Sequence, residues 1–101
     1  MSRFLMVGGL VAAGFDSTGK YLLTVSHSGR GLFRVTDWEK VARDLELIYP
    51  ENDQVEGIGP ISGELVRIVQ KDYETETFRL VAQDSSFTLY CTSSEIEIVY
   101  Q

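Results

Sequence analysis

Hydrophobic and polar positions alternate along much of this chain, and the alternation predicts β-strands. Between residues 20 and 26, Tyr21, Leu23 and Val25 recur at every second position. A period of two places all three side chains on one face of an extended strand. The following segment, 32–35, repeats the pattern, so two neighbouring strands are predicted here.

The segments that flank these strands have the composition of tight turns. Asp16-Ser17-Thr18-Gly19 suits a type I turn closed by a left-handed glycine. The segment 26–31, Ser-His-Ser-Gly-Arg-Gly, carries two glycines that give the backbone the freedom a turn needs. Residues 10–35 are therefore predicted to form a three-stranded antiparallel meander.

A different period begins after the meander. Apolar residues stand at i, i+3, i+4 and i+7, namely Trp38, Val41, Ala42 and Leu45. This spacing forms one face of an α-helix. Thr36 followed by Glu39 matches the capping box that opens many helices. A short helix is predicted over residues 37–46.

The second half of the chain again favours strands. Segment 51–63 is rich in glycine and proline and predicts a long irregular loop. Four further strands are expected from the alternation and the short polar connections, at 64–70, 77–82, 87–92 and 95–100. At the other end, the apolar run 4–13 predicts a buried first strand with a bend at Gly8-Gly9. The alternative interpretation of that run is a signal peptide.

These elements predict a mainly β protein, α+β at most, with a single domain over residues 1–101. Two small antiparallel sheets would pack as a sandwich or an open barrel, with the helix near 37–46 at one end. A closed propeller is excluded, because it needs at least four four-stranded blades.

Two resemblances accompany this pattern. The run from Phe15 to Asp44 resembles one blade of a β-propeller of the WD40 or quinoprotein type. The sequence of residues 15–63 resembles small, uncharacterised bacterial single-domain proteins. The segments that carry the resemblance include Trp38-Glu-Lys-Val-Ala-Arg-Asp44 and Gly57-Ile-Gly-Pro60. Some small acidic proteins of this sort are immunity factors that neutralise a toxin. The resemblance implies such a role and transfers no catalytic residue.

Charge narrows the choice of partner. The chain has a net charge of −6, spread unevenly. Residues 1–36 hold four basic residues and one acid, a net +3, whereas residues 37–101 hold five basic and fourteen acidic residues, a net −9. Nucleic acids bind through lysine and arginine on phosphate, so no nucleic-acid partner is expected. The acidic part either serves the solubility of the chain or attracts a basic protein.

Cysteine content and hydropathy bear on location. Cys91 is the single cysteine, so no intramolecular disulfide forms and the chain needs no oxidising compartment. Cys91 lies in an apolar stretch and is expected to be a buried, inert thiol. The run 4–13 is shorter than the about 20 apolar residues that span a bilayer. A cytoplasmic protein without a membrane partner is predicted.

Candidate catalytic motifs are weak, and no enzyme activity or cofactor is predicted. Ser26-His27-Ser28 lacks a defined third member, and adjacent strand residues face opposite ways. One histidine and one cysteine offer no pair with zinc-ligand spacing. Asp16 is followed by Ser-Thr-Gly, which breaks the aspartic-protease pattern by one residue. The glycine-rich runs lack the lysine and helix start of a P-loop.

The function predicted from these observations is protein binding, most concretely as an acidic immunity-type inhibitor of a bacterial toxin or basic enzyme. Acidic residues would steer the partner and tyrosines would anchor it. The predicted partner-binding residues are Tyr49, Glu51, Asp53, Glu56, Asp72, Tyr73, Glu74, Glu76, Glu95 and Glu97. The alternative is a structural or small-ligand domain, with a pocket at the end of the sandwich under loop 51–63.

Overall fold

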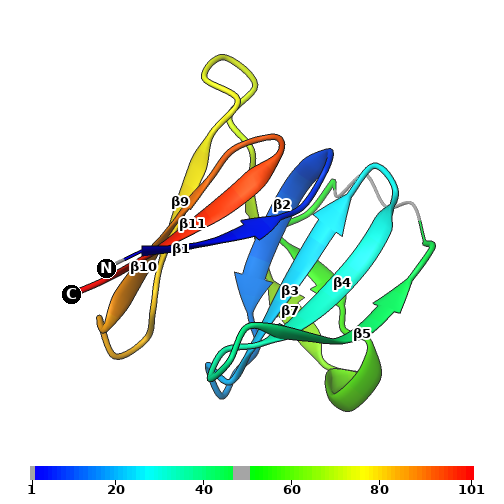
Figure 1. Ribbon diagram of the computed structural model, residues 1–101. Helices are drawn as coiled ribbons and strands as arrows, with labels where there is room; N and C mark the ends of the chain where they lie inside the picture. Colours follow the sequence, from blue (N-terminus) through cyan, green and yellow to red (C-terminus); the bar gives the residue numbers. More distant parts are fainter. Residues whose placement is uncertain (1, 47–50) are drawn as a thin grey trace.

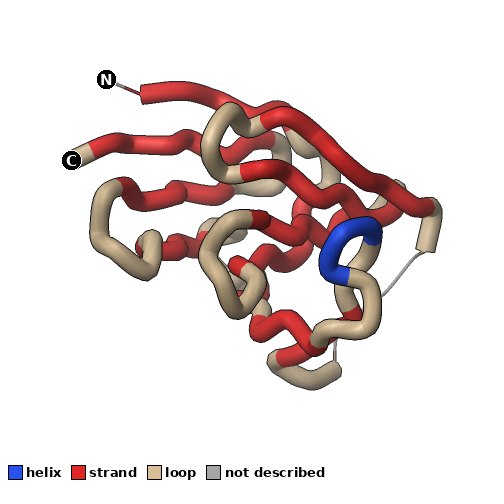
Figure 2. The backbone as a smooth tube through the Cα atoms, turned by 90° about the horizontal axis from the view of Figure 1, so that it is seen from below, coloured by secondary structure: helices blue, strands red, loops and turns tan. Residues whose placement is uncertain are grey.

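The structure, a computed structural model, describes residues 2–46 and 51–101, with the side chain of Ser2 left out. It is mainly β. The described strands are β1 (Ser2–Met6), β2 (Leu10–Phe15), β3 (Tyr21–Ser26), β4 (Gly29–Arg34), β5 (Glu39–Asp44), β6 (Gln54–Glu56), β7 (Leu65–Arg67), β8 (Val69–Gln70), β9 (Phe78–Val81), β10 (Phe87–Cys91) and β11 (Glu95–Tyr100). One 3₁₀ turn, η1 (Gly59–Ile61), accompanies them (Figure 2, blue).

The strands form three antiparallel sheets (Figure 1). A four-stranded sheet has the order β1-β11-β10-β9, and a five-stranded sheet the order β5-β4-β3-β2-β8. A small third sheet pairs β6 with β7. None of them closes on itself. The expectation of a mainly β sandwich is confirmed, as are the meander β2-β3-β4 and the three last strands.

The first hydrophobic core lies between the two larger sheets. Its fully buried side chains come from both sheets and include Leu10, Leu22, Leu89, Ile96 and Ile98. The alternation of each strand sends these residues inward, because successive side chains point to opposite faces. Burial of this apolar area is the main favourable term that holds the two sheets together.

A second core covers the opposite face of the five-stranded sheet. Leu23, Val25 and Leu32 from that face pack with buried residues of segment 55–68, which are Val55, Ile58, Ile61, Val66 and Ile68. The five-stranded sheet is therefore buried on both faces. The prediction of an irregular loop over 51–63 is wrong, since this segment contains β6 and η1 and forms a third layer.

One glycine permits the close approach of this third layer. A side chain at Gly14 on β2 would overlap the backbone carbonyl oxygen of Arg67 on β7. The absence of a Cβ atom lets the two backbones meet. Ile68, directly after β7, turns into the second core, and β8 then pairs with β2. The predicted strand 64–70 is thus divided between two sheets.

The helix predicted over 37–46 is absent, and this prediction is wrong. Trp38 has a φ of 58°, in the left-handed region, and its N–H donates to the carbonyl of Arg34 at 2.7 Å. The chain makes a tight turn there and returns as β5, paired along β4. A right-handed helix cannot include such a residue. Leu45, expected on the helical face, is 79% exposed, whereas Trp38 is buried as expected.

The apolar run 4–13 is also divided between two strands. It forms β1 in the four-stranded sheet and β2 in the five-stranded sheet, joined by a turn at Gly8-Gly9. The bend at these glycines is confirmed. The prediction of one buried strand is wrong, because Phe4 and Met6 on β1 face solvent. β1 lies at the edge of its sheet beside β11, which brings the two ends of the described chain together (Figure 1).

Candidate functional site

The residues predicted to bind a partner fall into three groups. Tyr49 lies outside the described residues. The first group, in and before β6, is exposed and comprises Glu51, Asp53 and Glu56. The second group lies in the exposed connection from β8 to β9 and comprises Asp72, Tyr73, Glu74 and Glu76. The third group, Glu95 and Glu97, lies on β11 and is partly exposed.

The second group belongs to a projecting hairpin (Figure 1, yellow). Asp72 forms an isolated antiparallel bridge with Thr77, and its carboxylate accepts the N–H of Glu74 at 2.9 Å. The Glu76 N–H donates to the Asp72 carbonyl at 2.6 Å. The ammonium of Lys71 lies 5.8 Å from the centre of the Tyr73 ring. These contacts fix the hairpin and leave its carboxylates outside any ion pair among the described residues.

The first group lies beside the base of this hairpin. The Gln70 side-chain amide donates to the carbonyl of Asn52 at 3.1 Å, and Gln70 stands two residues before Asp72. Asp53 is partly neutralised, because its carboxylate pairs with Arg67 at 3.2 Å. The structure thus brings the residues around 52–53 next to the second group, although they are distant in sequence.

The third group lies on the solvent-facing side of the four-stranded sheet. We call this surface the outer face; its residues are Phe4, Met6, Arg79, Val81, Tyr90, Glu95, Glu97 and Val99. In register, Phe4 stands beside Glu97, and Glu97 beside Tyr90. Met6 stands beside Glu95. The outer face therefore combines carboxylates with large apolar side chains.

The apolar residues of the outer face are unusually accessible. The exposed fractions are 52% for Phe4, 74% for Met6, 51% for Val81 and 45% for Tyr90. Exposed apolar side chains scattered singly are ordinary, but neighbours gathered on one sheet face mark interaction sites. Neither Glu95 nor Glu97 takes part in an ion pair within the described part of the chain.

Sequence reasoning missed Phe4, Met6 and Tyr90 as site residues. A signal existed, because Phe4 and Met6 flank Leu5 at alternate positions and Leu5 is buried. The surrounding run 4–13 is apolar at nearly every position, however, and this pattern predicts a buried strand. Tyr90 has the same relation to Leu89 and Cys91, both of which are buried.

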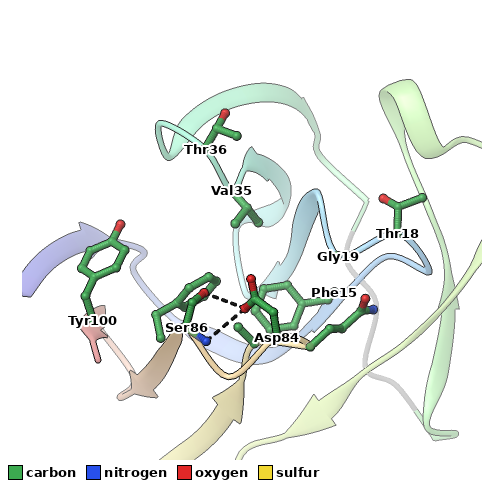
Figure 3. Close-up of a pocket in the computed structure, with 11 residues that line it drawn as sticks. Phe15, Thr18, Gly19, Val35, Thr36, Asp84, Ser86 and Tyr100 are labelled. Atoms are coloured by element: carbon green, nitrogen blue, oxygen red, sulfur yellow. Dashed lines mark hydrogen bonds between the residues drawn. The ribbon is translucent and has the colours of Figure 1, made fainter.

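A cavity of about 340 Å³ opens at one end of the sandwich (Figure 3). Phe15, Val35 and Phe87 contribute apolar surface, and Asp84 lies at the rim. The Asp84 carboxylate accepts the hydroxyl and the N–H of Ser86 at 2.6 and 3.0 Å, and these bonds hold the pKa of Asp84 below its usual range. Segment 51–63 does not line this cavity, so the predicted position under that loop is wrong.

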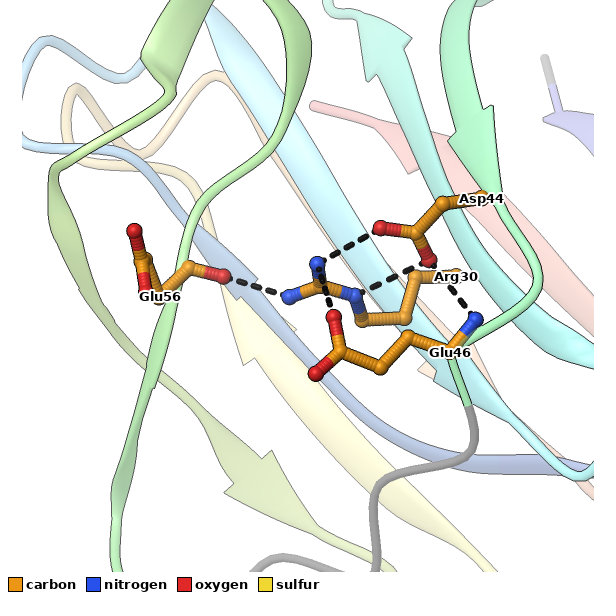
Figure 4. Close-up of polar contacts among 4 residues, drawn as sticks. All are labelled: Arg30, Asp44, Glu46 and Glu56. Atoms are coloured by element: carbon orange, nitrogen blue, oxygen red, sulfur yellow. Dashed lines mark hydrogen bonds and ion pairs between the residues drawn. The ribbon is translucent and has the colours of Figure 1, made fainter.

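A buried arginine ties β5 to the third layer (Figure 4). Arg30 donates to both carboxylate oxygens of Asp44, at 3.2 and 2.6 Å, to Glu46 at 3.0 Å and to the Glu56 carbonyl. Its hydrogen bond to Asp44 raises the pKa of Arg30 and lowers that of Asp44. All these groups satisfy one another, so the cluster is structural.

The candidate nucleophiles lie in structural roles. The Ser26 hydroxyl donates to the carbonyl of Gly29 at 2.7 Å and closes the turn between β3 and β4. His27 lies in the same turn and its backbone N–H donates to Gly9. Cys91 is buried, and burial raises the pKa of its thiol to about 12. A thiol with so high a pKa is a poor nucleophile at neutral pH.

No three histidine, cysteine, aspartate or glutamate side chains in 2–46 and 51–101 gather to hold a metal ion. Among the same residues no helix is long and apolar enough to cross a membrane.

These observations define a mainly β sandwich with a third covering layer and an amphipathic outer face. Comparison of the chain with protein-family models, curated proteins and solved structures found no match. The resemblances to a propeller blade and to immunity proteins therefore stay predictions.

Proposed function

We propose that this protein is a non-enzymatic binding module that holds a basic protein partner on its outer face. The observation that carries the proposal is the juxtaposition of Phe4, Met6 and Tyr90 with the carboxylates of Glu95 and Glu97. An interface of this kind needs large apolar anchors that lose water on binding and charges that select the partner.

The two kinds of residue have separate roles in this proposal. Burial of Phe4 and Tyr90 against the partner supplies affinity and slows dissociation. Glu95 and Glu97, together with the acidic hairpin 72–76, attract positive charge and speed the encounter. The hairpin projects from the same end of the four-stranded sheet as Glu95, because β9 begins at Phe78 and Phe78 pairs with Cys91 beside Ile96.

The biological role that we propose is that of an immunity-type inhibitor, which would cover the working surface of a cationic bacterial toxin or enzyme. The support is the small size, the net charge of −6 and the resemblance of residues 15–63 to small bacterial proteins. A cytoplasmic location belongs to the same proposal, since one buried cysteine suits a reducing compartment.

The test is affinity capture from the source organism, followed by kinetic measurement with the purified partner. In the first variant, Phe4→Ser and Tyr90→Ser remove the anchors. Its control carries Leu65→Ser and Tyr73→Ser, which remove exposed apolar side chains that lie outside the outer face. We expect the dissociation rate to rise about tenfold or more in the first variant, the scale of a lost hot-spot residue.

A charge variant tests the steering. Glu95→Gln with Glu97→Gln should lower the association rate at low salt and leave it little changed at high salt, because salt screens exposed charges beyond about 8–10 Å. Equal binding by the wild type and the Phe4/Tyr90 variant would contradict the proposal. Loss of binding only in the Leu65/Tyr73 control would move the interface to the hairpin and third layer.

A second candidate function is binding of a small molecule in the end cavity. Its volume of about 340 Å³ falls in the range of about 300–1,000 Å³ found for ligand pockets, and aromatic residues contribute to its walls. A fragment library screened by NMR tests this function. Saturable shifts confined to Phe15, Asp84 and Phe87 would support it, and no binder at millimolar concentration would exclude it.

A further inference from the structure

A smaller cavity, about 140 Å³, lies over β3, β4 and β5 and is separate from the end cavity. We call it the basic groove; the residues that matter here are Val7, Gly8, Thr24, Gly31, Lys40 and Arg43. Val7 and Gly8 belong to the corner between β1 and β2. Lys40 and Arg43 lie on β5, the edge strand of the five-stranded sheet.

The acids nearest the groove are held by two arginines of β4, and one of these pairs, Arg30 with Asp44, also lines the groove. Arg34 holds Asp37 and Glu39 at 2.7 and 3.3 Å. Arg30 holds Asp44 and Glu46. Every acid of segment 37–46 is thereby engaged by these two arginines, which are not in β5.

Lys40 and Arg43 are left without a carboxylate partner among the described residues. Lys40 and Arg43 are two exposed cations on one short strand of a chain whose net charge is −6. Both lie on the side of β5 from which the groove is lined. Their positive charge therefore attracts an anionic group that enters the groove.

Gly31 shapes the floor between these cations. A methyl group added there would lie 3.2 Å from the Thr24 hydroxyl oxygen and 3.4 Å from Cε of Lys40. The stem of Lys40 therefore runs across Gly31, and its ammonium lies 5.4 Å from the centre of the Phe33 ring. Arg43 is the cross-strand partner of Gly31, so both cations flank the same bare stretch of β4.

The hydroxyl groups in the floor are committed to the protein. Thr24 donates to the Gly31 carbonyl at 3.2 Å, and Ser26 donates to the Gly29 carbonyl at 2.7 Å. The charged donors that remain for a ligand are the ammonium of Lys40 and the guanidinium of Arg43. A matching ligand group accepts hydrogen bonds and carries negative charge.

We propose that the basic groove binds the oxyanion group, a phosphate or a carboxylate, of a small molecule. The volume admits one such group with a few further atoms, and two cations are too few to follow a nucleic-acid backbone. The proposal does not rest on the proposed function, because neither Lys40 nor Arg43 belongs to the outer face, although Met6 of that face also lines the groove.

The test is a titration of ¹⁵N-labelled protein with sodium phosphate, pyrophosphate and acetate at constant ionic strength. We expect saturable shifts at the amides of Gly8, Gly31 and Arg43 with at least one of the three probes. The order of affinities distinguishes a phosphate site from a carboxylate site. Shifts spread over all basic residues, or none that saturate, would overturn the proposal.

Variants locate the site. Lys40→Gln with Arg43→Gln should weaken binding about tenfold or more, the scale of lost charged hydrogen bonds. The matched control, Lys20→Gln with Arg79→Gln, removes the same charge from other exposed positions and should bind as the wild type does. Equal weakening in both variants would show a diffuse charge effect and overturn the site.

A third variant keeps the charges and alters the floor. Gly31→Ala should displace the Lys40 stem and weaken binding, with a melting temperature that shows whether the fold is retained. Unchanged affinity in a folded Gly31→Ala protein would contradict the geometry argued for the groove.

Discussion

Substitution of Trp38 tests the turn that replaces the expected helix. Trp38 is 3% exposed, its Nε1–H donates to the Tyr100 hydroxyl at 2.7 Å, and its ring lies 5.3 Å from that of Phe87 with an angle of 86°. Trp38→Ala removes all three contributions and should cost about 3–5 kcal/mol, as for aromatic residues in well-packed cores. Trp38→Phe keeps an aromatic ring and should cost less.

The difference in stability between Trp38→Ala and Trp38→Gly tests the left-handed backbone of this turn more directly than the stability of either variant alone. A non-glycine residue in the left-handed region costs about 1–2 kcal/mol. Glycine escapes that cost but loses about 0.5–1 kcal/mol more backbone entropy on folding. Because the φ of Trp38 is 58°, Trp38→Gly should be more stable than Trp38→Ala, by up to about 1.5 kcal/mol. In a helix interior the order is reversed, with glycine about 1 kcal/mol worse.

The assay is urea unfolding followed by far-ultraviolet circular dichroism, since the variants lack the only tryptophan. In a domain of about 100 residues, 1 kcal/mol corresponds to roughly 4–8 °C in Tm, so thermal melts resolve the same difference. If Trp38→Gly were the less stable variant by about 1 kcal/mol, the left-handed turn would be refuted. An unchanged midpoint for Trp38→Ala would refute the aromatic anchor of the first core.

Three more predictions concern the described contacts. Asp44→Asn should lower stability at pH 7 by about 2 kcal/mol, less than for a fully buried pair because Asp44 is one-third exposed. Its pKa is lowered by Arg30, so the difference from wild type should persist above the ordinary value of 3.8 and shrink as acid protonates Asp44, as urea midpoints across pH would show. Gly14→Ala should cost about 1–3 kcal/mol, whereas Gly8→Ala, with nothing within 4 Å, should change Tm little; equal effects would contradict the close approach to β7. Native Cys91 should react with iodoacetamide only as fast as the protein unfolds, and rapid labelling without urea would disprove its burial.

Local chemistry made the central meander predictable. The turn at 16–19 has its left-handed Gly19 and a bond from the Gly19 N–H to the Asp16 carbonyl at 3.1 Å. Such turns depend on residues within four positions of each other, which a sequence displays directly. The alternation in β9, β10 and β11 is equally visible, because each strand has one buried face.

The features that sequence could not predict depend on distant residues. The buried indole of Trp38 donates its Nε1–H to Tyr100, 62 residues away, while the local spacing of Trp38 fits a helix equally well. Val55 and Ile61 are isolated apolar residues in a glycine-rich segment, and their role appears only when β2 and β3 offer a second face.

The outer face likewise contains residues that the sequence predicts and residues that it does not. Alternation correctly predicted that Glu95 and Glu97 point away from Ile96 and Ile98. Alternation alone could not identify the apolar residues beside these acids, because Phe4 lies next to Glu97 only through the pairing of β1 with β11. A surface assembled from strands so far apart in sequence is visible only in the folded chain.

The pairing of β1 with β11 joins the first and the last strands of the described chain to be synthesised. The residues of β1 are the first of the described chain to leave a ribosome, but their pairing partners at 95–99 are made 89 to 97 residues later. Until then Leu5 lacks the cover it has in the first core, and β1 has an unpaired edge on both sides. Long-range pairing of this kind slows folding because a large loop must close first. All five strands of the five-stranded sheet are made once residue 70 has been added, whereas the four-stranded sheet and its outer face also require β9, β10 and β11.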